Sequence, residues 1–591
     1  IEVSPRQTVL DRQGRRQLLV TAHLSNGRRE DITDQVLYIS NDKNVVEVSR
    51  NGLVSAAGSG ETAILIRAAG HAASAGFGVI EKPIVDYPEV ERRNFIDESV
   101  FSKLRKFNII PSELSSDEEF LRRICLDLTG TLPPPERVRE FLSSDNPRKR
   151  DELIEILLDS PEYVDYWGFR FSDLMRVTVT SANVPDMTKA YEDWVTNSIA
   201  ANKPYDQMAR ERVAAQGYAA PARNLFYVTE VMKPEKIMAE HVRVFFGRRL
   251  DCAQCHNHPF ENWSQNQFWG LTAFYSGLEE LRDSHVVLDA LGGGHVDRTG
   301  DAKLRHPKTK EEVVPTFLEG TRLPEKEWLD PRLQLAKWMT SHPYFAEAAA
   351  NRIWGYLFAR GIVDPVDDFR TTNPPSHPAL LEALAEDLRD HNHDLKHLIR
   401  TIVQSRTYQL SGKPNETNRG DKVNYSRAFA RPLDAAVLLD AISRATGVEE
   451  DFDFHKFAGG GSPPPRTRAM QMIPDLCPSQ FMDAFGRSMR KMPVLGNPEP
   501  TLGQALHMWV GSTYTSKITT EGGRLDRLLK SGSSDDEIIE EFYLSALMRL
   551  PTPGERADLL AFMRQRTSRR EEVLGGFVWA LVSSREFAYN H

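Results

Sequence analysis

The sequence predicts a multidomain, mainly α protein, in which an N-terminal β-sandwich is followed by a large helical body of two domains. Three observations predict this fold class. The chain has 591 residues, which is enough for several hydrophobic cores. Its composition, 40% hydrophobic and 27% charged, is that of an ordinary globular protein. Short alternating apolar runs end near residue 82, and from Asn94 onward the apolar residues recur with helical spacing instead.

Residues 1–82 are predicted to form the β-sandwich. Apolar and polar residues alternate in short runs such as 17–22 and 63–66, and turn signals such as Asn26-Gly27 lie between the runs. Strands interrupted by turns roughly every 8 to 12 residues are typical of a sandwich. The order of these phrases, in particular 51–56, resembles the bacterial immunoglobulin-like domains of adhesins and cell-surface proteins. The resemblance implies a spacer or a contact surface, so we expect no chemistry in this domain.

Residues 90–282 are predicted to form the first helical domain, in which an expected helix at 235–246 runs directly towards a pair of cysteines. Residues 283–330 show little periodicity and contain three consecutive glycines, so they are predicted to be an irregular linker. The helical period returns in residues 331–591, which are predicted to form the second helical domain. Its last apolar helix, at 573–581, is expected to dock onto the body.

The charge balance and the hydropathy exclude two classes of partner. Lys and Arg number 74 and Asp and Glu number 83, a net charge of −9, which gives no basic field for nucleic acid. No run of about 18 apolar residues occurs, so no membrane span is expected. The chain begins at Ile1 with a strand pattern close behind, as it would after removal of a targeting segment. We therefore expect an exported protein, periplasmic or at the cell surface, although a start chosen for expression would look the same.

The strongest chemical signal is Cys252-Ala253-Gln254-Cys255-His256. With this spacing two thiols bond covalently to a haem, and the adjacent His supplies an axial nitrogen to the iron. We predict one haem c on Cys252 and Cys255, with His256 as the axial ligand. His258 cannot easily reach the opposite face of the same ring. The nearest candidates in sequence for a second axial ligand, each more often a core or surface residue, are His241, Met238, Met232, His285 and His295.

Two other interpretations of the cysteine pair remain open. Cys252 and Cys255 are also half of a zinc site, which His256, His258 or His241 could complete. The pair could equally be a redox dithiol or a disulfide. The two remaining cysteines, Cys125 and Cys477, are far away in sequence and are expected to be core residues.

Several phrases around these cysteines resemble a known family. Residues 94–97, 126–134, 240–247, 252–260 and 263–265 resemble the cytochrome-associated domain of unknown function that is abundant in planctomycetes. Its planctomycete-specific companion domain is resembled by 351–354, 363–369, 375–378, 405–408, 485–487 and 586–591. The resemblance implies exported bacterial proteins, often fused to cytochrome c modules or to immunoglobulin-like domains, with no assigned activity. The companion domain often has cysteines after its Phe-Gly-Arg phrase, and 490–495 has none here.

Three further clusters have a functional and a structural interpretation. Asp364, Asp367 and Asp368 could bind Ca²⁺ or hold a general acid or base, but an ion-paired loop is commoner. A buried Arg352 on an apolar helix would need a carboxylate partner, and Asp367 or Asp368 is expected to provide it.

The third cluster contains three histidines. His391, His393 and His397 are spaced so that only His393 and His397 share a helical face. The pair could bind zinc, but a solvated polar face is commoner and is expected here.

These observations predict an exported c-type cytochrome-like protein, active in electron transfer or haem-dependent oxidoreduction with a redox partner protein or a small-molecule substrate. The alternative is a cell-surface structural or scaffold protein. In that case the Cys-x-x-Cys-His region would bind zinc or no cofactor, and the β-domain would make the cell-surface or self-assembly contacts. The common nucleotide-binding and hydrolase signatures are missing, which leaves open whether the protein is an enzyme.

Overall fold

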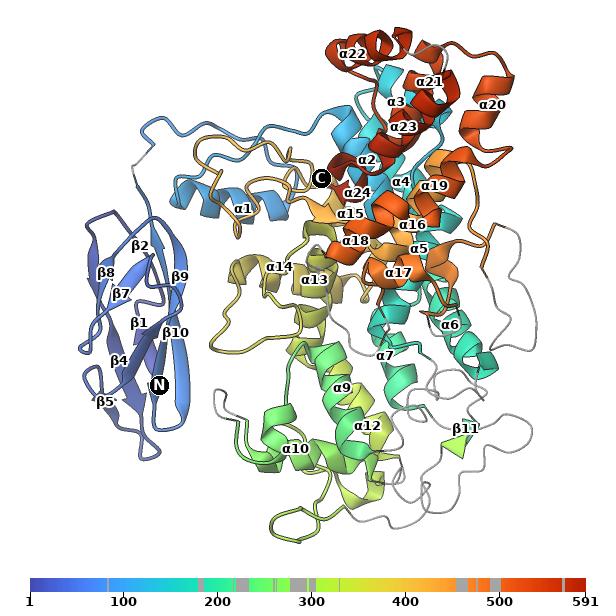
Figure 1. Cartoon of the computed structure of the whole chain (residues 1–591). Coiled ribbons are helices and arrows are strands. Elements are labelled where there is room, and N and C mark those ends of the chain that lie inside the picture. The colour runs from blue at the N-terminus through green and yellow to red at the C-terminus, as the bar shows by residue number, and fades with distance from the viewer. Residues whose placement is uncertain are drawn as a thin grey trace.

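Two parts of unequal size make up the molecule, a small β part and a large helical body (Figure 1). The computed structural model describes residues 1–81, 84–178, 185–215, 217–218, 233–258, 261, 263–276, 295–296, 304–328, 330–452, 466–474, 477–488, 490, 501–565 and 569–591. Residues 1–79 form β-strands, the remainder is the helical body, and 49% of the chain is helix. The predicted fold class is confirmed. Every helix in the described ranges is too short or too polar to cross a membrane.

The β part consists of short strands in three sheets. The sheets have the strand orders β1-β4-β5, β2-β10-β9-β6 and β3-β8-β7, and only β2 and β10 among these pairs run parallel. The strands are β1 (Glu2–Ser4), β2 (Gln7–Leu10), β3 (Arg15–Gln17), β4 (Leu19–His23), β5 (Arg29–Asp31), β6 (Leu37–Ser40), β7 (Val46–Val48), β8 (Leu53–Ala56), β9 (Gly60–Ala68) and β10 (His71–Val79). This arrangement fits the expected immunoglobulin-like domain.

The β part has a hydrophobic core of its own. Val20, Val46, Val54 and Ile64 are fully buried in it, and none of its buried residues belongs to the core of the helical body. The Asn51-Gly52 turn joins β7 to β8 with Gly52 at a φ of +76°. A Cβ atom at Gly52 would also lie 2.7 Å from the hydroxyl oxygen of Tyr38. The positive φ and the lack of space therefore both favour glycine at this position.

The first stretch of the helical body begins where the sequence predicts it. Ser116 caps α2 by accepting a hydrogen bond from the Glu119 amide, and Gly130 ends that helix in the left-handed conformation. Pro135 then begins the next helix. The helices of this stretch are α1 (Phe95–Lys106), α2 (Asp117–Thr129), α3 (Pro135–Ser143), α4 (Lys149–Leu158), α5 (Pro161–Leu174), α6 (Pro185–Ala200), α7 (Tyr205–Val213), α9 (Pro234–Phe246) and α10 (Gln265–Thr272).

The second stretch is also helical, and its last long helix is docked, as expected. Leu574, Phe577 and Val578 of that helix, α23, are buried. The helices are α12 (Pro331–Ser341), α13 (Pro343–Phe358), α14 (Pro378–Asp390), α15 (Leu395–Gln404), α16 (Ala435–Thr446), α17 (Gln480–Ala484), α18 (Leu502–Val510), α19 (Ser512–Thr519), α20 (Arg524–Lys530), α21 (Asp535–Phe542), α22 (Pro553–Arg564), α23 (Arg570–Val582) and α24 (Arg585–Ala588). Two short ribbons pair β11 (Gly217–Tyr218) with β12 (His295–Val296) and β13 (Arg431–Pro432) with β14 (Tyr589–Asn590).

One continuous core runs through both helical stretches. It extends from Ile96 on α1 to Phe587 on α24. Within the predicted linker, residues 304–328 contain no long helix or strand. They nevertheless pack on the body, since the ring centroid of Phe317 lies 4.9 Å from that of Phe274 and 5.2 Å from that of Trp338. Most of the rest of that linker is outside the described residues. The two helical stretches therefore share their buried apolar surface.

Buried carboxylates tie the two stretches together. Asp97, on α1, accepts hydrogen bonds from the main-chain N–H groups of Arg406 at 3.0 Å and Thr407 at 2.8 Å, and from the Thr407 hydroxyl at 2.7 Å. Asp127, on α2, accepts from the Tyr408 hydroxyl at 2.7 Å. Both acids are fully or almost fully buried. The phrases that resemble the first family domain thus contact those that resemble the second.

The β part is attached to the body through α1. The Lys103 ammonium lies 2.9 Å from the Glu61 carboxylate of β9 and donates to the main-chain oxygen of Ser376 at 2.6 Å. Burial lowers the pKa of Lys103, and Glu61 opposes that shift. Gly78 of β10 lies directly against the ring of Phe107, where no side chain would fit. A buried charge and a close backbone approach therefore fix this contact.

We predict that Asp97→Ala lowers the free energy of unfolding of the helical body by about 3–5 kcal/mol, because each buried donor left unsatisfied costs about 1–3 kcal/mol. Denaturant unfolding followed by helical circular dichroism measures the change. Glu98→Ala, one residue along the same helix, is the matched control. Glu98 is exposed and makes one ion pair, with Arg92, so its loss should cost less than about 1 kcal/mol. Equal losses in the two variants would contradict the role given to Asp97.

Candidate haem-attachment site

The Cys-x-x-Cys-His segment forms a tight turn on the surface. Helix α9 ends at Gly247 in the left-handed conformation, and the chain then enters a 3₁₀ turn, η2 (Asp251–Gln254). Cys252 and Cys255 are both exposed and are not joined to each other in a disulfide. Side chains three residues apart lie on the same side of a 3₁₀ turn, so we expect Cys252 and Cys255, which directly follows the turn, to share one face. Ala253, between them, is buried and anchors the turn.

His256 is exposed and oriented by the chain that follows it. Its Nδ1 lies 2.7 Å from the main-chain oxygen of Asn257. If Nδ1–H donates to that oxygen, the lone pair is on Nε2, which is the arrangement of most metal-ligating histidines. The turn is also attached to α10: the main-chain oxygen of Gln254 accepts from the side-chain amide of Gln265 at 2.9 Å and from the Trp269 indole at 3.1 Å.

The segment before the cysteines is held by the second helical stretch. Arg249 donates to both oxygens of Asp367, with Nη2 2.5 Å from Oδ1 and Nε 3.2 Å from Oδ2. Arg243 lies 3.6 Å from the same carboxylate, and the main-chain N–H of Phe369 donates to the oxygen of Gly247 at 2.9 Å. A side chain at Gly247 would collide with Phe369. Residues 363–371 therefore form the support on which the segment rests.

The other predicted ligands lie in different environments. His241 is fully buried, with Nδ1 2.6 Å from the hydroxyl of Tyr275, and burial lowers its pKa well below the usual value. His258 is partly buried, and burial, then Arg370 and His256, lower its pKa. Met238 is buried in the core. Met232 and His285, and the side chain of His295, lie outside the described residues.

The residues described around the cysteines do not form a ready-made metal cage. Among the described residues, one group of three or more His, Cys, Asp or Glu has ligand atoms that all lie within 4.8 Å of one another, and it is elsewhere in the chain. Haem attachment at Cys252 and Cys255, and zinc binding there, stay predictions. Cys125 and Cys477 are buried, as expected, and burial raises the pKa of the Cys125 thiol to about 12.

The acidic cluster is ion-paired. Asp367 binds Arg249, Asp368 lies 2.9 Å from Arg370, and Asp364 lies 3.9 Å from Arg360. The structural interpretation of this cluster, a loop held by ion pairs, agrees with these contacts.

The expected pairing of Arg352 with Asp367 or Asp368 is wrong. Arg352 is buried, but Asp367 and Asp368 pair with other arginines, and Nε and Nη2 of Arg352 have no hydrogen-bond partner among the described residues. Its neighbour Asn351 binds the loop instead. The Asn351 side chain donates to the main-chain oxygen of Val363 at 2.9 Å and accepts from the Val363 N–H at 2.8 Å. A neutral amide can serve a main-chain donor and acceptor together, which a guanidinium cannot.

The expected grouping of the three histidines is also wrong. His391 ends α14, and Asn392 and His393 are both left-handed, with φ of +54° and +56°, so no single helix contains all three. The imidazole rings of His391 and His397 are stacked 3.7 Å apart. His393 faces Asp206 instead, at 3.8 Å.

Sequence reasoning missed Arg243 and Arg249 as the residues that secure the motif. The signal was present as a complementary charge pattern: basic residues precede the cysteines, and acidic residues are concentrated at 364–368. Only the fold brings the two sets together, because more than 100 residues separate Arg249 from Asp367.

The fold and this segment define a multidomain, mainly α protein that carries a Cys-x-x-Cys-His segment in the first of two fused helical domains. Residues 95–280 match the family described as protein of unknown function DUF1549 (PSCyt2), and residues 331–563 match protein of unknown function DUF1553 (PSD1). Together the two matches cover more than half of the chain, which belongs to the proteins that carry these two domains in this order. No curated protein matches the chain.

We predict that Asp367→Asn lowers the free energy of unfolding by about 1–3 kcal/mol, because it leaves Arg249 and Arg243 near an uncharged amide. The effect is smaller than for a fully buried pair because the Arg249 side chain is partly exposed. Asp364→Asn is the control, since its 3.9 Å contact with Arg360 is exposed and should contribute less than about 0.5 kcal/mol. Denaturant unfolding of both variants distinguishes them. If the two substitutions cost the same, Asp367 does not hold the segment.

Proposed function

We propose that the protein is an exported c-type cytochrome-like protein that carries one haem, bonded to Cys252 and Cys255 with His256 as the axial ligand. The observation that carries the proposal is the exposed turn itself. Its two cysteines are both exposed, and His256 follows with Nδ1 beside a main-chain oxygen. A haem can approach exposed thiols without displacing packed side chains, and Nε2 is the nitrogen left to ligate the iron.

The residues around the turn have positioning roles in this proposal. Gln265 and Trp269 donate to the main-chain oxygen of Gln254, which attaches the turn to α10 at the residue between the two cysteines. Arg249, bound to Asp367, fixes the chain that leads into the turn. A bound haem supplies one-electron chemistry at iron, with a potential that depends on the ligand opposite His256. His241 is a weaker candidate for that position than its place in the sequence suggests, because it is fully buried against Tyr275.

The proposed role is electron transfer or haem-dependent oxidoreduction, with a redox partner protein or a small-molecule substrate. Covalent haem attachment is completed outside the cytoplasm, so the proposal includes export to the periplasm or the cell surface. The β part, attached through Lys103 and Glu61, would make contacts at that surface.

We expect protein produced with haem-attachment machinery to show a Soret band and, after reduction with dithionite, the sharp bands of a c-type haem. The pigment should resist extraction with acidified acetone, because thioether bonds hold it. Replacing both Cys252 and Cys255 with Ala should make any remaining pigment extractable. Replacing the buried Cys125 with Ala is the matched control and should leave the pigment covalent.

A chain without a Soret band, after production in a host that matures other c-type cytochromes, would contradict the proposal. Zinc in that chain, retained by native protein and lost from the double Ala variant, would support the alternative of a structural or scaffold protein with a zinc-bound turn.

A further inference from the structure

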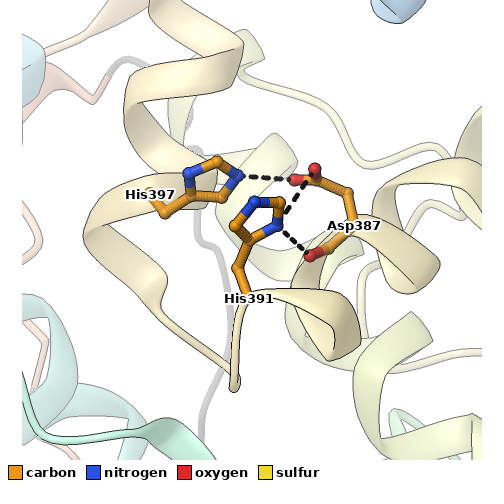
Figure 2. A group of neighbouring side chains, drawn as sticks. All are labelled: Asp387, His391 and His397. Carbon is orange, nitrogen blue, oxygen red and sulfur yellow. Dashed lines mark hydrogen bonds and ion pairs between the residues drawn. The ribbon is translucent and has the colours of Figure 1, made fainter.

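Three potential metal ligands meet where α14 is joined to α15. Asp387 lies in the last turn of α14 and His391 ends that helix, while His397 lies in the first turn of α15 (Figure 2). Asp387 and His391 are four residues apart, so they lie on the same face of the helix. The left-handed residues Asn392 and His393 turn the chain back, which brings His397 to that face.

The three side chains are already gathered. One nitrogen of each imidazole and one oxygen of the carboxylate all lie within 4.8 Å of one another. His397 Nε2 is 3.1 Å from Asp387 Oδ2, close to the roughly 3.3 Å that separates ligand atoms on a tetrahedral zinc ion. The two rings are stacked 3.7 Å apart with an angle of 17° between their planes. Because the nitrogen lone pairs lie in the ring planes, the His391 ring must rotate before both rings can ligate one ion.

The surroundings orient the His391 ring. Its Nδ1 lies 2.8 Å from the main-chain oxygen of Asp387 and 3.4 Å from Oδ1 of the Asp387 carboxylate. An N–H that donates to a main-chain oxygen is the usual outer contact of a metal-ligating histidine, and it leaves Nε2 to ligate. The His391 side chain is 48% exposed, so the ring can also turn without displacing packed atoms.

The charge environment favours a cation. In the part of the chain that the structure describes, the Asp387 carboxylate makes no ion pair with an Arg or Lys, and both of its charged contacts are with histidines. This separates it from Asp367, Asp368 and Asp364, each of which faces an arginine. The Asp387 side chain is only 17% exposed. A mostly buried carboxylate beside two imidazoles supplies three metal ligands, and a divalent cation would balance the charge of the carboxylate.

We propose that Asp387, His391 and His397 bind one divalent transition-metal ion of the zinc class, with a fourth position open to solvent. Two imidazoles and one carboxylate suit zinc, whereas calcium and magnesium prefer oxygen ligands throughout. The ion would bridge two consecutive helices and fix the angle of the turn between them. The site is separate from the Cys-x-x-Cys-His segment and does not depend on whether haem is bound there.

Zinc affinity of the full chain is the test, measured by competition with a chromophoric chelator and by metal analysis. We expect His397→Gln to weaken zinc binding by at least about 100-fold, because changes even to outer-shell partners of a metal cost 10- to 100-fold. Asp387→Asn should have a similar effect. His393→Gln is the matched control: it lies in the same turn but faces Asp206, so its zinc affinity should stay within about 2-fold of the native value.

Cobalt distinguishes this site from the cysteine pair. Thiolate ligands give Co²⁺ an intense near-ultraviolet charge-transfer band, whereas nitrogen and oxygen ligands give the weaker visible bands alone. We expect the visible bands to persist when Cys252 and Cys255 are both replaced by Ala, and to disappear when His397→Gln is added to that double variant. If the native chain and His397→Gln bind zinc equally, or if the native chain binds none and is folded, the three residues form only a hydrogen-bonded cluster and the proposal is wrong.

Discussion

A carboxylate removed from water must have its hydrogen bonds supplied by the protein, and the helical body depends on two such groups. Asp127 is completely buried, and it accepts hydrogen bonds from Tyr408 and Asn590 and pairs with Arg431. Burial raises the pKa of Asp127, and Arg431 and Tyr408 act in the opposite direction. Because these partners come from distant parts of the chain, the acid is satisfied only when all of them are in place. The core therefore closes as one unit.

This constraint explains why the two helical domains behave as one body. The first domain supplies Asp97 and Asp127, and the second supplies most of their partners. Removing either half would leave charges or main-chain donors buried without partners, which costs more than the loss of a surface contact. The position of the segment with the two cysteines also depends on the second domain, because Arg249, which precedes the segment, is bound to Asp367 of that domain.

Environment separates the histidines of this chain into different chemical types. His241 is in the core, where burial holds its pKa far below the usual value. His256 is at the surface with Nδ1 beside a main-chain oxygen. His391 and His397 share one carboxylate. The residue type alone does not decide which of these environments a histidine occupies, because its chemistry depends on which polar atoms surround the ring.

The sequence by itself determined the local structure and the one strong motif. The Asn26-Gly27 turn and the helical period from Asn94 onward are local signals, and the elements follow them. The Cys-x-x-Cys-His segment was likewise visible, because its spacing is itself the signal.

Only the tertiary structure decided which distant side chains meet. It paired Asp367 with Arg249 rather than with Arg352, and it stacked His391 on His397 rather than placing His393 beside His397. The physical reason is the same in both cases. Periodicity describes neighbours along one helix, whereas these contacts depend on a turn of left-handed residues or on the packing of two domains, and neither has a period in the sequence.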